Sequence, residues 1–212
     1  MNAAEPELVE ANSTVHIVRT GVANLASVIA AVERIGARPV LIERAEEVAQ
    51  APRLLLPGVG AFGAAMDELH RLGIVDALRA RVAAGAPTLT ICLGLQLLAR
   101  TSEETPGAVG LGVIDAAVTR FNGPVRVPQM GWNRVEPTPG ARWVTPGFAY
   151  FANTFKLGAI PSGWQGATAD HGGAFVAAIE RGDVLACQFH PELSGAWGAA
   201  LLRRWVAGTA AC

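Results

Sequence analysis

Short apolar runs alternate with helix-like segments through the first half of the chain, and this alternation restricts the possible folds more than any other feature. The runs at 15–19, 38–43, 53–57 and 87–92 are predicted strands, and helices are predicted at 24–36, twice within 61–84 and at 93–102. In the first helix, apolar residues three and four apart form one buried face: Leu25, Val28, Ile29, Val32 and Ile35. This order favours a mostly parallel sheet with helices on both faces and functional loops at the carboxyl ends of the strands.

The second half of the chain indicates a different arrangement. From about residue 112 onward, Gly and Pro turns separate strand-like segments, which favour an antiparallel extension of the sheet. These segments are PVRVPQ (124–129), WNRVE (132–136), FAYFAN (148–153), GAFVAAIE (173–180) and DVLACQFH (183–190). A helix is predicted at 195–208. Since the chain has 212 residues and is 51% hydrophobic, we expect a single α/β domain over 14–212, after an N-terminal tail at 1–13.

Charge and cysteine content argue against several function classes. Lys and Arg number 17 and Asp and Glu 18, so no basic surface for nucleic acid is expected. The N-terminal segment lacks the pattern of a signal peptide, and no apolar run approaches the roughly 20 residues of a membrane span. A cytoplasmic protein without membrane contact is therefore expected. Cys92, Cys187 and Cys212 have no C-x-x-C spacing, which argues against a disulfide framework and a metal site.

The loop PGVGAFG at 57–63 lies between a predicted strand and a predicted helix, so it matches the dinucleotide-binding pattern G-x-G-x-x-G. A nucleotide site also requires an acidic residue about 20 positions later, at the end of the following strand. That strand ends in TICLG, and the carboxylates on the way lie in helical segments. The pattern therefore favours another use of the loop's backbone N–H groups over a nucleotide site.

Cys92 lies in TICLGLQLL, at a predicted tight junction between a strand and a helix. In a nucleophile elbow the reactive side chain sits on such a turn, exposed at the edge of the sheet, and a small residue such as Gly94 leaves the turn room. A buried core cysteine is the alternative, because cysteine is among the most buried residue types. The segment alone fits both interpretations.

A cysteine nucleophile needs a base, usually a histidine that a third group orients. Three of the four histidines lie in segments typical of surface or core positions. His190 differs, since it ends a predicted strand in the sequence HPE. In an extended segment, residues two apart point to the same side, so Glu192 would hold the imidazole tautomer and stabilise its charged form. An exposed HPE turn is the alternative.

Three motifs, PGVGAFG, ICLGLQLL and QFHPE, resemble in order and spacing those of the class I glutamine amidotransferases. VPQMGWN (127–133) and GVANLASV (21–28) are similar, within that family, to the glutaminase subunits of imidazole glycerol phosphate synthase. The resemblance covers nearly the whole chain and implies a flavodoxin-like α/β fold. It also implies that a Cys92–His190–Glu192 triad hydrolyses glutamine to glutamate and ammonia through a glutamyl thioester, without a metal or organic cofactor.

The same resemblance implies further roles around the nucleophile. The backbone N–H groups of Gly60 and Leu93 would stabilise the oxyanion of the tetrahedral intermediate, which gives the Gly-rich loop a use other than nucleotide binding. The implied contacts with L-glutamine are made by Gly58, Gln96, Thr154 and Phe155.

The resemblance also implies a partner, because ammonia released into water would be protonated. The partner would be a (β/α)8-barrel cyclase of histidine biosynthesis, which forms a heterodimer with the glutaminase and receives the ammonia directly. The implied contact positions are Asn24, Met130, Trp132 and Asn133. Ordinary core packing is the alternative for Met130 and Trp132.

The chain departs from the family pattern at several positions and keeps the triad. RTGVAN stands where DYGxGN is usual, YFANTF where YFVHSY is usual, and leucine where a lysine usually follows HPE. Thr90 replaces the leading glycine of the elbow. The replacements are Arg19, Thr20, Thr90, Asn153, Phe155 and Leu193.

Three alternatives to this function remain open from the sequence. The chain would be the glutaminase of another synthase, such as the pyridoxal phosphate glutaminase, although MGWN argues for the first assignment. It would otherwise be a flavodoxin-like hydrolase or peptidase that uses the elbow cysteine without a partner. The third alternative is a degenerate, non-catalytic subunit, and the departures at Thr90 and Leu193 are compatible with it.

Overall fold

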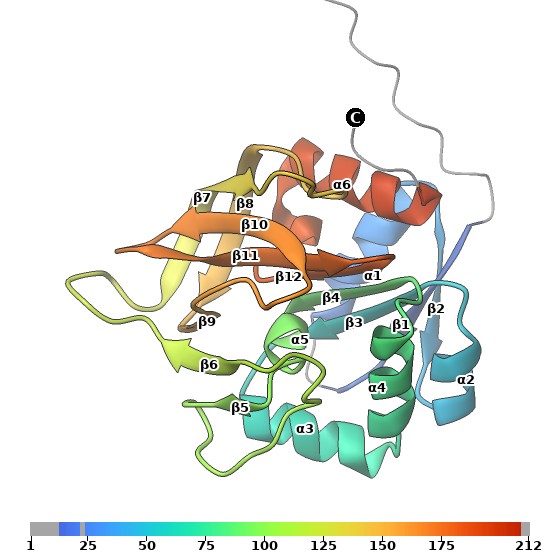
Figure 1. The fold of residues 1–212 in the computed structure, drawn as a ribbon. Coiled ribbons are helices and arrows are strands. Elements are labelled where there is room, and N and C mark those ends of the chain that lie inside the picture. The colour runs from blue at the N-terminus through green and yellow to red at the C-terminus, as the bar shows by residue number, and fades with distance from the viewer. Residues whose placement is uncertain (1–12, 22–23, 209–212) are drawn as a thin grey trace, which may run out of the picture.

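A central sheet, with nine strands in the described residues, organises the molecule (Figure 1). The structure, a computed structural model, describes residues 13–21 and 24–208; nearly all of the predicted tail at 1–13, as well as Cys212, lies outside these ranges. In spatial order the strands are β2 (Arg38–Ile42), β1 (Thr14–Val18), β3 (Leu54–Gly58), β4 (Thr88–Cys92), β12 (Val184–Cys187), β11 (Ala174–Arg181), β10 (Gln165–Asp170), β7 (Gln129–Pro137) and β8 (Gly147–Asn153).

The first five strands of this order run parallel to one another, so their carboxyl ends lie along one edge of the sheet. Along this edge Cys92, the last residue of β4, pairs with Gly58 of β3. On the other side of β4, Cys187 of β12 pairs with Ile91. The segments that follow β3, β4 and β12 therefore leave the sheet side by side, although they are far apart in the sequence.

The remaining strands β11, β10, β7 and β8 pair antiparallel, which confirms the predicted antiparallel extension for these strands. The strand predicted at 183–190 differs, because β12 runs parallel to β4 and antiparallel to β11. A second, smaller sheet contains β5 (Thr101–Ser102), β6 (Ala117–Arg120) and β9 (Phe155–Leu157). The strand β9 follows β8 almost directly, so residues 153–155 link the large sheet to the small one.

Helices cover both faces of the sheet, as the alternating pattern predicts (Figure 1). α1 (Leu25–Arg34) and α6 (Gly195–Ala207) pack on one face, where Val28 and Trp205 belong to one buried cluster. α2 (Ala45–Gln50), α3 (Phe62–Arg71) and α4 (Val75–Ala83) cover the other face, with Leu69 and Leu78 in a second cluster. The short α5 (Leu93–Gln96) follows β4.

Two predicted elements are wrong. The helix predicted at 93–102 ends at Gln96, because the carbonyl groups of residues 97–99 accept hydrogen bonds from the returning segment 111–113 instead of continuing the helix. The segment 124–128 is not a strand, and β7 begins only at Gln129. Pro124 and Pro128 lack the N–H group that a strand ladder requires, which explains the late start.

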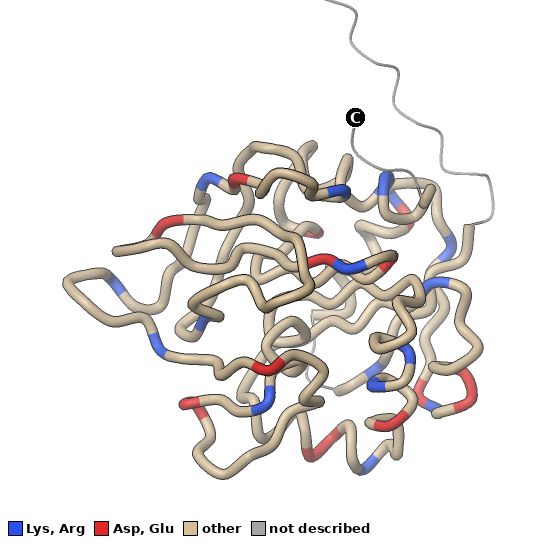
Figure 2. The backbone as a smooth tube through the Cα atoms, in the orientation of Figure 1, with Lys and Arg blue, Asp and Glu red and all other residues tan. Residues whose placement is uncertain are grey.

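Acidic and basic residues are distributed over the whole described chain, with both signs in the region of α2, α3 and α4 (Figure 2). Within the ranges 13–21 and 24–208, no helix has both the length and the apolar character required to span a bilayer.

Candidate active site

Cys92 lies on a sharp turn between β4 and α5, as the elbow pattern predicts. Its φ of 55° is the only positive φ of a non-glycine residue in the described part of the chain, and its ψ is −107°. Such a conformation is strained for a residue with a side chain and persists only where the surroundings enforce it. The surroundings include Gly94, where an added Cβ would lie 2.6 Å from the Leu56 carbonyl oxygen. This close packing fixes the turn beneath the thiol.

The Gly-rich loop lies directly beside this turn. A Cβ on Gly58 would lie 2.8 Å from the Gly94 nitrogen and 3.0 Å from the Leu93 Cβ, so only glycine allows β3 and the elbow to approach this closely. Gly58 is not among the described residues that line the pocket, and it packs against Leu93 and Gly94 of the elbow instead. Gly60, with a φ of 97°, and Leu93 do line the pocket next to Cys92.

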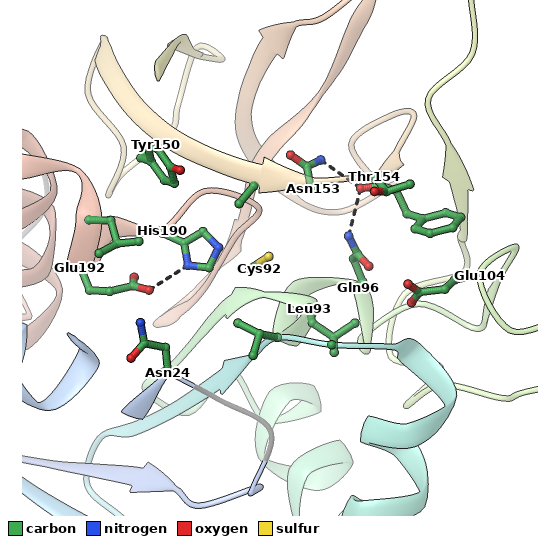
Figure 3. A pocket seen from close by; sticks show the side chains of 15 residues that line it. Asn24, Cys92, Leu93, Gln96, Glu104, Tyr150, Asn153, Thr154, His190 and Glu192 are labelled. Carbon is green, nitrogen blue, oxygen red and sulfur yellow. Dashed lines mark hydrogen bonds and ion pairs between the residues drawn. The ribbon is translucent and has the colours of Figure 1, made fainter. Parts of the chain in front are cut away.

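His190 and Glu192 form a close pair at the same edge (Figure 3). The His190 Nδ1 atom is 2.8 Å from the Glu192 Oε1 atom, and both side chains are largely buried. The prediction of an extended HPE segment is wrong, since β12 ends at Cys187 and residues Pro191–Leu193 form a 3-10 turn. The turn nevertheless brings the carboxylate to the ring, because the Glu192 side chain folds back toward His190, which is the N-cap residue of the turn.

The environment of His190 favours its charged form. Burial by itself opposes the charge, but hydrogen bonds and charge interactions with Cys92 and Glu192 outweigh burial and raise the pKa of His190 to about 10. In Figure 3 the Cys92 side chain lies beside the His190 ring, on the side away from Glu192. The site therefore favours an imidazolium at His190.

A short cycle of hydrogen bonds holds the backbone of His190. The His190 N–H donates to the Tyr150 carbonyl oxygen of β8 over 2.9 Å. The Ser194 hydroxyl donates to the His190 carbonyl oxygen over 2.6 Å and accepts from the Tyr150 N–H over 2.9 Å. Ser194 is buried, so these bonds have no competition from bulk water. His190 is thus tied to a strand of the antiparallel extension.

A pocket of about 430 Å3 opens above the elbow, with Cys92 and His190 in its wall. Three of the predicted substrate positions line it: Gln96, Thr154 and Phe155. Sequence reasoning missed Glu104, which lines the pocket at the end away from Glu192 and accepts the Phe62 N–H over 2.7 Å (Figure 3). Glu104 lies in an irregular turn, where no spacing rule marks it. Tyr150 was also missed, because strand periodicity does not distinguish it from its neighbours.

The structure places three of the four predicted contact residues around one hollow and the fourth, Asn24, in the wall of the main pocket. Asn24 caps α1 and lines the main pocket. Met130 and Trp132 are 69% and 58% exposed on β7, so the core alternative for them is wrong, and both line a second hollow of about 360 Å3. Asn133 lines the same hollow and donates to the Asp170 carbonyl oxygen. The Trp132 ring packs edge-on against Tyr150, which connects this surface to the main pocket.

The departures from the family pattern have distinct surroundings. Arg19 forms an exposed ion pair with Glu43, with its Nε atom 2.5 Å from the carboxylate. Leu193 is 40% exposed and lines the mouth of the pocket. Asn153 is buried and donates to the Phe155 carbonyl oxygen. Thr90 is buried within β4, 3.3 Å from the position of an added Cβ on Gly94.

Comparison with known proteins places the chain in a family. Residues 16–207 match the family model of class I glutamine amidotransferases. A relative from Salmonella typhimurium, imidazole glycerol phosphate synthase subunit HisH, is 43% identical over 197 residues, which cover 90% of this chain and 97% of the relative. A chloroplastic protein of Arabidopsis thaliana, imidazole glycerol phosphate synthase hisHF, is 38% identical over 92% of this chain and 34% of its own length.

Among solved structures, a glutamine amidotransferase superposes with a TM-score of 0.72 at 23% identity, over 92% of this chain and 99% of that chain, which shows the shared fold. The chain therefore belongs to the class I glutamine amidotransferases and, within them, to the HisH subunits of imidazole glycerol phosphate synthase. It is a glutaminase with the flavodoxin-like α/β fold of that class, so the predicted family, fold and enzyme class are confirmed.

Proposed function

We propose that the chain hydrolyses glutamine with Cys92 as nucleophile, His190 as general acid and base, and Glu192 as the group that orients the imidazole. The observation that carries this proposal is the convergence of the segments that follow β4 and β12: the strained turn after β4 presents the Cys92 thiol beside the buried His190–Glu192 pair. Strained backbone and a perturbed histidine in one pocket are typical of a catalytic site.

In the first step the Cys92 thiolate attacks the side-chain amide carbon, and a C–S bond forms. Because its pKa is about 10, His190 carries a proton at neutral pH and donates it to the departing nitrogen, which leaves as ammonia. The neutral imidazole then takes a proton from water, whose oxygen attacks the glutamyl thioester and releases glutamate. Glu192 accepts the Nδ1–H throughout and so keeps Nε2 directed at the reacting atoms.

The oxyanion formed in both steps would accept hydrogen bonds from the backbone N–H groups of Gly60 and Leu93. Leu93 is the first residue of α5, where the N–H has no partner within the helix. The positive φ of Gly60 supports the assignment, because a glycine can turn its peptide group toward the pocket without steric cost. Gly58 would act indirectly, since its missing side chain lets the loop approach the elbow.

The rest of the pocket would bind the amino-acid end of glutamine. Gln96, Thr154 and Phe155 supply polar atoms along the wall, and Glu104 supplies a carboxylate at the end away from His190. One oxygen of Glu104 already accepts the Phe62 N–H, which leaves the other available for the α-ammonium group of the substrate. This proposed route uses no metal or organic cofactor.

The proposed partner is a (β/α)8-barrel cyclase, which would receive the ammonia in a cytoplasmic heterodimer. This assignment is supported by the name of the Salmonella relative, a synthase subunit, and by the Arabidopsis relative, two thirds of which extends beyond the match. An exposed face of the β7–β8 pair, here called the hairpin face, is suited to the contact, and it consists of Met130, Trp132, Phe148 and Tyr150. Asn24 and Leu193 line the same pocket as Tyr150 of this face.

The decisive test compares two cysteine variants of the full chain with the cyclase present. Cys92→Ala is expected to lose glutamate production and covalent labelling by a glutamine-mimicking diazo ketone. Cys187→Ala is expected to retain both, because Cys187 is completely buried in β12 and burial raises the pKa of its thiol well above the usual range. Undiminished glutamate production by a folded Cys92→Ala protein would refute the triad.

A further inference from the structure

A chain of side-chain hydrogen bonds leads from the wall of the pocket to the sulfur of Cys92. The Gln96 Nε2 atom donates to the Phe155 carbonyl oxygen and to the Gln188 Oε1 atom, each over 3.0 Å. The Gln188 Nε2 atom in turn donates to the Cys92 Sγ atom over 3.8 Å. Gln188 is completely buried, and its backbone N–H donates to the Ala177 carbonyl oxygen of β11.

The direction of this chain is fixed by chemistry at its far end. A backbone carbonyl can only accept, so Gln96 must turn its NH2 group, and not its oxygen, toward Phe155. The second hydrogen of that NH2 group then points at Gln188, so the Gln188 side-chain carbonyl oxygen must accept this hydrogen bond. The remaining side of the Gln188 amide is its NH2 group, and this group faces the sulfur. The Phe155 carbonyl oxygen therefore determines, through Gln96, that Gln188 presents its N–H group to the Cys92 sulfur.

We infer that Gln188 is a further catalytic residue, whose side-chain N–H stabilises the thiolate form of Cys92. The inference rests on the proposed role of Cys92 as nucleophile. A hydrogen bond from a neutral donor to an ionised acceptor is stronger than one to the neutral form, so the contact favours thiolate over thiol. Because water cannot reach Gln188, the loss of this donor would not be compensated by solvent.

The other ionisable groups around the thiol belong to different elements. His190 and Glu192 approach from the segment after β12, Tyr150 lines the pocket from β8, and Glu104 lines it from the loop after β5. The donor from Gln188 adds to His190, which interacts with the same sulfur. Since Gln96 lines the substrate pocket and holds Gln188, the chain also links the pocket wall to the nucleophile.

The test measures the rate of alkylation of Cys92 by iodoacetamide from pH 5 to 10, with mass spectrometry of the Cys92 peptide as the readout. Only the thiolate reacts, so the midpoint of the profile reports its formation without any need for glutaminase activity. In Gln188→Leu we expect the midpoint to move about one pH unit upward, which corresponds to the lower end of the range for a hydrogen bond to a charged group. Gln188→Glu should move it further, because a carboxylate would face the sulfur.

Val176→Ala is the control, since Val176 is completely buried on the neighbouring strand β11 and does not line the pocket, so its truncation should lower stability without removing a polar contact of Cys92. Its alkylation profile should match that of the wild-type chain. A Gln188→Leu protein that is folded and has an unchanged midpoint would overturn the inference, whatever its melting temperature.

If Gln188→Leu does not fold, Gln96→Leu decides the question. This variant keeps Gln188 but frees its amide to rotate, so a smaller upward shift of the midpoint is expected, and an unchanged midpoint would overturn the inference. The proposed function is tested separately: if Cys92→Ala keeps glutaminase activity while the alkylation midpoint shifts as expected, the triad fails and the hydrogen bond stands.

Discussion

Cys92 and Cys187 lie on adjacent parallel strands, yet their surroundings give the two thiols different chemistry. Burial, together with the charges of Glu180 and Glu192, raises the pKa of Cys187 well above its usual range, so this thiol stays protonated. Cys92 is held on a strained turn at the wall of a pocket, beside His190 and the amide of Gln188. At the scale of single residues, the environment of each thiol is determined by neighbours from other strands.

The roles within the pair His190–Glu192 predict an order of effects. Glu192→Gln can still accept the Nδ1–H but cannot balance the charge of the imidazolium, whereas His190→Ala removes the proton carrier itself. We expect Glu192→Gln to keep at least about tenfold more kcat/KM than His190→Ala, since orienting groups in such triads contribute less than the base. Steady-state glutaminase assays of both variants check this order, and the reverse order would show that the two roles are misassigned.

The raised pKa of His190 also predicts a pH dependence of stability. The folded state holds this proton up to about pH 10, whereas the unfolded chain releases it near 6.5. The stabilisation is therefore complete below about 6.5 and is lost as the pH rises through 10, with a slope of up to about 1.4 kcal/mol per pH unit in between. Urea unfolding of the wild type and of His190→Gln should give a difference in unfolding free energy that shrinks across this window. A constant difference would contradict the assignment.

At the scale of elements, the hydroxyl of Ser194 connects the turn that carries His190 to β8. In Ser194→Ala the partly buried Tyr150 N–H loses its partner, which should cost about 1 kcal/mol of stability. Because the same change releases the His190 carbonyl, kcat should fall several-fold, while KM stays nearly constant. Thr138→Ala is a suitable control, since Thr138 ties β7 to β10 through a hydroxyl bond to the Gly166 carbonyl away from the pocket. It should lose stability and keep kcat; equal losses of kcat in both variants would contradict a positioning role for Ser194.

Periodicity and turn residues were sufficient to predict the parallel strands β1 to β4, the helices α1, α3, α4 and α6, and the turn at Cys92, whereas β12 was expected in the antiparallel extension. They did not predict that the helix after Cys92 would stop at Gln96, because that end depends on hydrogen bonds from residues 111–113. The pocket residue Glu104 was missed for the same reason, since only tertiary packing brings its loop to the site. Gln188 could have been noticed as a polar residue inside the apolar run VLACQF.

At the scale of the whole molecule, Leu193 predicts that the chain binds a cyclase from its own source better than a cyclase from a typical pair. Leu193 is exposed and lines the pocket. A cyclase whose surface pairs a charge with the usual lysine would find leucine here, and the charge of the cyclase would remain unpaired. Loss of one partner of a buried charge pair typically costs about 2–5 kcal/mol, or tens to thousands of fold in affinity. Arg19 is a weaker determinant, because Glu43 of the same chain already pairs with its charge.

The experiment titrates glutamate production with a cyclase from the same source and with one from a typical pair. The cyclase from the same source should activate the wild-type chain far more strongly, and Leu193→Lys should narrow or reverse the preference. Val109→Lys provides the control, because it makes the same change at an exposed apolar residue that does not line the pocket. Equal activation of the wild-type chain by both cyclases would remove Leu193 from the working contact.

The position of β12 has a consequence for the moment at which the enzyme becomes active. β12 is the last strand in the described residues, yet it lies inside the sheet between β4 and β11, and Gln188 follows Cys92 by 96 residues. A growing chain on the ribosome therefore carries Cys92 long before Gln188, His190 and Glu192 have been translated. Under the proposed mechanism, a chain that ends before these residues hydrolyses no glutamine, because it lacks the proposed base and its orienting carboxylate.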